Sequence, residues 1–436
     1  MSVRRKSVAL AIAASIITFG SLQQIALAQP PSPPPLSTPG LTDTPVAPPN
    51  TEAMRLAGIA KDNAREFGSS PDDPGPLAKD VSPAITPAAI EKATRKVADW
   101  ELTNFGQYFG TLDRSRQLDG RIWTWSALYA GYMAASSEFG EGKYRDAMEQ
   151  VGKAYDWGLI TKLPALPNGD NMSVAQTYLE LYLTDKDPTQ IAPIRASLDA
   201  ILAAPRVELN TPGKRIEWWW CDALFMAPPT WARMYAATGD PKYISYLDQE
   251  WAKTNTLLYD TQAHLYARDA TYIPKTEKNG QKIFWGRGES WVLGGLARTL
   301  QYLPKDDPAR VKYETQLKEM AAALAKLQRP DGLWTSSLLD PADFPEPELS
   351  GSSLITFGMA WGINNGVLDR KTYTPVVTKA WAGMLTHIYA DGRLGDIQQT
   401  DAAPSTYKPS ASYNYGVGGF LLAGSELHKM SESKKK

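Results

Sequence analysis

Apolar residues along this chain recur mainly at helical spacing, and few segments alternate apolar and polar residues as strands do. An apolar segment rich in small residues is repeatedly followed by a Gly/Asp/Pro turn and then by a more polar helical segment. This pattern predicts an all-α domain of stacked helix hairpins that share a continuous core. The expected hairpins pair residues 125–139 with 145–157, 174–183 with 191–203, 229–237 with 244–258, 291–302 with 310–327, and 355–363 with 373–389.

The two ends of this helical region indicate how the repeats are arranged. The first helix should begin at Thr86-Pro87, because Thr is a good helix cap and Pro a good first helical residue. The last apolar helix, residues 417–427, has no polar helix after it. An open solenoid and a closed ring are both compatible with the repeats. Pairing of the last helix with the first favours a closed toroid of six hairpins, in which the loops at one end form a concave site.

The N-terminal region has a different composition. Basic residues 4–6, an apolar run over 8–22 and small residues at 26–28 are typical of a secretory signal peptide. No other segment is apolar enough for a membrane anchor, so we expect an exported protein of the periplasm or the extracellular medium. The expected domains are a signal peptide (1–28), a Pro-rich linker with an irregular segment (29–85), the helical domain (86–430) and a charged tail (431–436).

Composition excludes several classes of function. The 46 basic and 47 acidic residues are balanced, which gives no electrostatic reason to expect nucleic-acid binding. The single cysteine permits no internal disulfide or thiolate cluster. Since no spaced set of His, Asp and Glu stands out either, we expect no metal and no other cofactor. The abundance of aromatic residues, 14 Trp and 20 Tyr, instead suggests stacking platforms for carbohydrate.

Long connectors between the hairpins carry the unusual residues, and long loops in a compact domain commonly build a binding site. One of them contains three consecutive Trp residues, Trp218 to Trp220, followed by the only cysteine and Asp222. Neither a helix nor a strand places three adjacent side chains on one face. A wall of indole rings beside one acid suits a sugar-binding site with a proton donor. The alternative is a Trp-rich core turn in which Asp222 caps a helix.

Three other connector residues are candidates. Asp170 precedes an inner helix and is either a second carboxylate of the site or a helix cap. His264 is one of three histidines and is either a site residue or a satisfied polar residue. Arg287 lies between two glycines, with Trp285 and Trp291 expected to flank it, and could grip a carboxylate with two hydrogen bonds. The alternative for Arg287 is a structural pair with an Asp.

From residue 97 to residue 427, a series of motifs resembles glycoside hydrolase family 105, the unsaturated rhamnogalacturonyl hydrolases. The most specific motif is Trp-Trp-Cys-Asp-Ala-Leu-Phe-Met-Ala-Pro-Pro at 219–229. The others are His-Leu-Tyr at 264–266, Phe-Trp-Gly-Arg-Gly at 284–288, Gln-Arg-Pro-Asp-Gly-Leu-Trp at 328–334, Ala-Trp-Gly-Ile-Asn-Asn-Gly at 360–366 and Tyr-Gly-Val-Gly-Gly-Phe at 415–420.

The resemblance implies a six-hairpin (α/α)6 barrel and hydrolysis of the 4,5-unsaturated uronic acid that polysaccharide lyases leave at the non-reducing end. The expected partner is thus a small acidic unsaturated oligosaccharide. Asp222 matches the general acid/base and Asp170 the second carboxylate of such enzymes. The remaining matches are to residues that contact the uronate (His264 and Arg287) or line the pocket (Trp220 and Trp285).

One position departs from the family pattern. Asn-Gly is expected after Gly288, but Glu289-Ser290 stands there, which would place an extra acid beside Arg287. This difference leaves the reaction class unchanged and the identity of the sugar open. Two other functions compete with the hydrolase: a conventional glycosidase that uses Asp170 and Asp222 as an acid–base pair, and a non-catalytic protein that binds acidic oligosaccharides.

Overall fold

A buried helix and a more exposed helix alternate along the chain, as the hydrophobic pattern predicts. The computed structural model describes residues 68–109, 119–161 and 166–433. Within these residues, the inner helices are α3 (Trp123–Phe139), α6 (Ala175–Asp185), α9 (Pro228–Thr238), α11 (Gly286–Leu300), α13 (Leu349–Asn364) and α15 (Asn414–Glu432). Their outer partners are α4 (Gly142–Ala154), α7 (Pro188–Ala203), α10 (Pro241–Leu258), α12 (Arg310–Lys326), α14 (Arg370–Leu385) and α2 (Pro87–Phe109).

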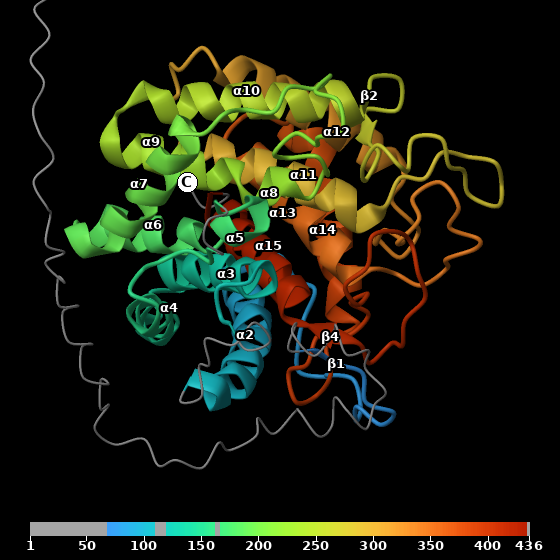
Figure 1. The fold of residues 1–436 in the computed structure, drawn as a ribbon. Coiled ribbons are helices and arrows are strands. Elements are labelled where there is room, and N and C mark those ends of the chain that lie inside the picture. The colour runs from blue at the N-terminus through green and yellow to red at the C-terminus, as the bar shows by residue number, and fades with distance from the viewer. Residues whose placement is uncertain (1–67, 110–118, 162–165, 434–436) are drawn as a thin grey trace, which may run out of the picture. The chain divides into compact units, whose positions relative to one another are not determined.

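The inner helices form a closed ring. Each one contacts the next along the chain, and α15 contacts both α13 and α3, while α2 packs against α15 as its outer partner (Figure 1). The ring confirms the predicted all-α, six-hairpin (α/α)6 barrel and the pairing of the last helix with the first. It also brings the connectors between successive hairpins together.

The two kinds of helix differ because their sequences differ. All residues of α13 from Leu349 to Ile363 are buried, since this helix is enclosed on every side. Outer helix α4 instead buries Tyr144, Ala147, Met148 and Val151, which share one helical face. Each large apolar side chain buried in this way contributes about 1.5–3 kcal/mol.

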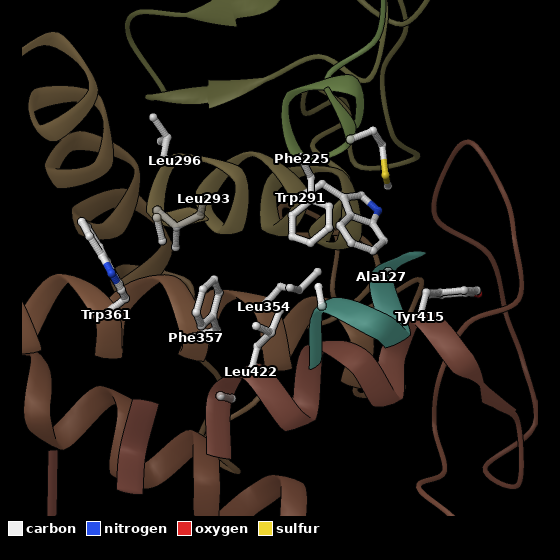
Figure 2. Close-up of a cluster of buried hydrophobic side chains, with 14 of the residues drawn as sticks. Ala127, Phe225, Trp291, Leu293, Leu296, Leu354, Phe357, Trp361, Tyr415 and Leu422 are labelled. Atoms are coloured by element: carbon white, nitrogen blue, oxygen red, sulfur yellow. The ribbon is translucent and has the colours of Figure 1, made fainter. Parts of the chain in front are cut away.

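The core lies between the inner helices. Figure 2 shows Trp291 against Phe225, with their ring centroids 4.7 Å apart, and Leu354 nearby. Glycine permits a close approach between α3 and α15: a Cβ on Gly418 would lie 2.1 Å from the backbone oxygen of Ala127. Small residues in the inner helices therefore set how tightly the ring closes.

The first helix of the barrel begins where the sequence predicts it. Helix α2 starts at Pro87, and the Thr86 hydroxyl accepts a hydrogen bond from the backbone N–H of Ala89 (3.4 Å). Residues 70–85 contain no helix, as expected, but they lie against the barrel: β1 (Gly68–Ser69) pairs with β4 (Ser412–Tyr413), and Leu77 bridges to Tyr389.

Only part of the predicted N-terminal and C-terminal segments can be compared with the structure. The predicted signal peptide and the linker up to residue 67 lie outside the described residues. Helix α15 continues to Glu432, two residues into the predicted charged tail. None of the helices in the described part of the chain combines the length and apolar character needed to cross a membrane.

Candidate active site

Short elements in the connectors position the two candidate acids. Asp170 lies on α5 (Gly169–Met172), and Asp222 lies immediately before α8 (Ala223–Met226). Helices α5 and α8 contact each other. The segment before α8 is held by an antiparallel bridge from Trp220 to Asp269 and by a hydrogen bond from Cys221 N to Arg268 O (2.9 Å). Residues far apart in the sequence are thus fixed side by side.

Neither acid acts as a helix cap. In α5 the cap is Asn168, whose side chain accepts a hydrogen bond from Asn171 N (3.0 Å), whereas Asp170 is inside the first turn. The Asp222 side chain makes no capping hydrogen bond to α8. Instead, it accepts a hydrogen bond from the Cys221 thiol at 3.3 Å. Both carboxyl groups therefore remain available to react.

The two acids are electrostatically coupled. Burial, followed by negative charge on Asp222, raises the pKa of Asp170 to about 7, against the opposing charge of Arg268. Burial also raises the pKa of Asp222, opposed by Arg268, by the Cys221 hydrogen bond and by Arg287. The pair consequently retains a proton near neutral pH, which an isolated aspartate would have lost.

Asp170 faces a cavity of about 400 Å³, which is within the size range of small-molecule sites. Trp219 and Trp220 form an aromatic wall of this cavity, with their ring centroids 5.1 Å apart. Trp218 is fully buried and packs against Tyr246 in the core. The other lining residues are Asn168, Arg215, Ile216, Glu217 and Arg268.

Arg268 is a site residue that the motifs did not identify. It lines the cavity and lowers the pKa of both acids. One Nη donates to Asp269 (2.6 Å), while Nε is buried and has no hydrogen-bond partner among the described residues. Arg268 follows strand β3 (Leu265–Tyr266) and precedes Asp269, the residue that bridges to Trp220. Arg268 therefore places positive charge at the cavity, beside the acids.

The two terminal nitrogens of Arg287 are engaged in hydrogen bonds within the protein. Its Nη atoms donate to the backbone oxygens of Gln398 (2.6 Å) and Gln399 (2.8 Å). The guanidinium lies over the rings of Trp285 (4.5 Å) and Tyr415 (5.1 Å). Arg287 therefore holds the 398–399 segment in place and supplies positive charge near Asp222.

Glu289, which the sequence places beside Arg287, points elsewhere. Its carboxyl group is fully buried and accepts the backbone N–H of Tyr266 at 2.8 and 3.0 Å. Burial, and to a smaller extent the charge of Asp222, raise its pKa well above the usual value. Glu289 thus anchors β3, next to Arg268, and does not pair with Arg287.

Five predicted site residues are not among the residues that line this cavity: Asp222, Arg287, Trp285, Trp291 and His264. Trp285 is buried and donates its indole N–H to Gln398 Oε1 (2.9 Å). Trp291 is buried in the core, 1% exposed, rather than at the cavity surface (Figure 2). His264 follows β2 (Tyr259–Asp260), and its Nδ1 lies 3.0 Å from the Tyr259 hydroxyl and 3.6 Å from Glu319. Of the predicted aromatic residues, the structure brings Trp220 to the cavity.

A pair of acids that keeps a proton beside aromatic rings is typical of enzymes that cleave glycosidic bonds. Comparison with known proteins agrees: residues 93–431 match the model of Glycosyl Hydrolase Family 88. This chain belongs to that family and is a glycoside hydrolase.

Individual relatives are similar over most of their length. A Formosa agariphila protein named unsaturated 3S-rhamnoglycuronyl hydrolase is 39% identical over 71% of this chain and 85% of its own. An Alteromonas sp. protein of the same name is 32% identical over 86% and 96% of the two chains. The solved structure of a family 88 glycosyl hydrolase from Bacteroides vulgatus is 32% identical, with a TM-score of 0.68, and covers 78% of this chain and 98% of its own. The predicted relationship to hydrolases of unsaturated uronyl groups is confirmed.

Proposed function

We propose that this protein is exported and removes the 4,5-unsaturated uronic acid from the non-reducing end of lyase-generated oligosaccharides. The observation that carries this proposal is the coupled pair Asp170 and Asp222, which keeps a proton near neutral pH beside an aromatic cavity. The names of the relatives from Formosa and Alteromonas support the substrate class. The basic and apolar N-terminal sequence supports export.

The reaction adds one water across a double bond. C4=C5 of the substrate is an enol ether, so a proton delivered by Asp222 to C4 leaves positive charge shared by C5 and the ring oxygen. Water then attacks C5 and gives its proton to the ionised carboxyl group. The hemiketal opens by breaking the C5–ring oxygen bond, and the resulting hemiacetal at C1 releases the second sugar. Asp170, with a pKa of about 7, shares the proton of the pair.

The substrate's carboxylate needs a cation next to the acids. We assign this contact to Arg268, because it lines the cavity together with Asp170, whereas the Arg287 Nη atoms already bind backbone oxygens. Arg287 contributes positive charge near Asp222, with Trp285 fixing its position. Trp220 forms the cavity wall, and Trp291 packs in the core against Phe225 of α8, next to Asp222 in the sequence. His264 lies against Tyr259 and does not line the cavity.

The test is to incubate the protein with unsaturated oligosaccharides produced by lyases and to follow the ultraviolet absorbance of the conjugated double bond. The expected result is loss of absorbance together with release of the second sugar. Turnover of the saturated counterparts alone would favour the conventional glycosidase. Binding without turnover would indicate a carbohydrate-binding protein.

A further inference from the structure

Three potential metal ligands converge where the first and the last inner helices end. Glu138 is the penultimate residue of α3, and His428 and Glu432 lie one turn apart near the end of α15. One ligand atom from each of these side chains lies within 4.8 Å of the other two. Residues 68–109, 119–161 and 166–433 offer no other group of three His, Cys, Asp or Glu side chains arranged in this way.

This cluster lies at the end of the barrel opposite the candidate active site. Helices α3 and α15 run parallel: Trp123 at the start of α3 packs against Tyr415 at the start of α15 (5.3 Å between ring centroids), and Phe139 at the end of α3 packs against His428 (5.1 Å). Arg287 lies over Tyr415, which marks the starts of these helices as the active-site end. A rise of 1.5 Å per residue puts the cluster roughly 20 Å away from it.

The charges around the cluster favour a cation. Two helix C-termini meet here, and each carries partial negative charge. Glu138 and Glu432 add two carboxyl groups. The Lys429 ammonium lies nearer to a third acid, Glu426 (2.9 Å), than to Glu138 (4.0 Å). Because the side chains of Glu138 and His428 are 10% and 9% exposed, water screens the charge of this pair weakly.

The spacing of the side chains is close to that of a metal site. His428 Nδ1 lies 2.6 Å from Glu138 Oε1 in a hydrogen bond. Ligand atoms of a tetrahedral zinc ion, at bond lengths of about 2.1 Å, are roughly 3.3 Å apart. A small separation of His428 from Glu138 and a rotation of the exposed Glu432 would therefore produce three ligands, with release of the shared proton.

We propose that Glu138, His428 and Glu432 bind a divalent transition-metal ion, such as zinc, that fastens α3 to α15. Imidazole with carboxylates suits zinc, whereas calcium and magnesium prefer ligand sets made of oxygen alone. Glu138 and His428 are 290 residues apart, so the ion would lock the closure of the ring. The same separation explains why no ligand motif is visible in the sequence. The role is structural and does not depend on the proposed hydrolysis.

The experiment measures the midpoint of thermal unfolding (Tm) of the protein, prepared without a histidine tag, in EDTA and in increasing zinc. We expect saturating zinc to raise Tm by about 3 °C or more, with calorimetry showing one zinc bound per chain at this site. Magnesium at the same concentration should give no such increase.

Two variants separate a metal site from a simple His–Glu pair. Glu432→Gln removes an exposed ligand but keeps the hydrogen bond between His428 and Glu138. Its Tm in EDTA should therefore stay close to that of wild type, while its affinity for zinc falls by at least about tenfold. His428→Ala should abolish the zinc-dependent increase in Tm.

The matched control is His387→Ala, which removes another histidine hydrogen-bonded to an acid, Asp396 (2.7 Å), and should leave the effect of zinc unchanged. Absence of a zinc-dependent increase in wild type would overturn the site, as would equal zinc affinity in wild type and Glu432→Gln. If His428→Ala does not fold, the comparison of wild type with Glu432→Gln still decides.

Discussion

Asp170 lies on α5 and Asp222 immediately before α8, two four-residue helices that contact each other, and burial together with negative charge on Asp222 raises the pKa of Asp170. This coupling gives the protein a proton that remains bound near neutral pH. An acid that protonates a carbon atom must be in its neutral form at the working pH. The proton held by the coupled pair meets this requirement.

Removal of the proton donor is the first prediction. Asp222→Asn keeps the shape of the side chain but provides no acid, so kcat should fall by about 10³-fold. The measurement is absorbance loss on an unsaturated disaccharide, with far-ultraviolet circular dichroism to confirm the helical fold. Retention of more than about one tenth of the activity would show that another group protonates C4.

The charge coupling gives a pH prediction. Since the pair loses its last proton as pH rises past the Asp170 pKa of about 7, kcat/KM should decline above about pH 7. The folded state binds the proton more tightly than the unfolded chain, where the pKa is about 4, so this carboxyl lowers stability progressively as pH rises between these values.

Asp170→Asn removes that cost. We expect the free energy of unfolding of this variant to exceed that of wild type, and we expect the difference to be larger at about pH 8 than at about pH 5. Urea denaturation at the two pH values measures it. A difference that is the same at both pH values would mean that Asp170 has an ordinary pKa in the folded protein.

The sequence predicts the ring of hairpins well because each inner and outer helix has its own hydrophobic pattern, as in α13 and α4. The motif that contains Trp220 also leads directly to the cavity. Arg268 was missed because its importance depends on a bridge between two connectors, which no local pattern reveals. His264 lies in the His-Leu-Tyr motif at 264–266, but the turn after β2 directs it towards Glu319.

This difference between Arg268 and His264 can be measured. Arg268→Ala should raise KM for the unsaturated disaccharide by at least about tenfold, because the uronate loses a charged hydrogen-bond partner. His264→Ala should change kcat/KM by less than about threefold, since His264 lies against Tyr259 and Glu319. The reverse order of effects would show that the loop rearranges when substrate binds.

Substitutions of Glu289 test whether this buried acid has a structural or a catalytic role. Glu289→Gln retains an oxygen that can accept the Tyr266 N–H, so the free energy of unfolding should change by less than about 1 kcal/mol. Glu289→Ala leaves that donor unsatisfied beside a new cavity and should cost about 2–3 kcal/mol. Chemical denaturation of both variants is the measurement. A larger loss of activity than of stability in Glu289→Gln would instead assign this acid to the reaction.

Arg287 supplies the last prediction, because its hydrogen bonds go to the connector and not to the cavity. Arg287→Ala removes donors from the backbone oxygens of Gln398 and Gln399 and leaves a gap between Trp285 and Tyr415. Amide hydrogen exchange should accelerate in residues 396–400 more than elsewhere in the barrel. KM and kcat should both worsen as Asp222 loses a nearby positive charge. An increase in KM alone, with unchanged exchange in the connector, would mean that Arg287 binds the uronate directly.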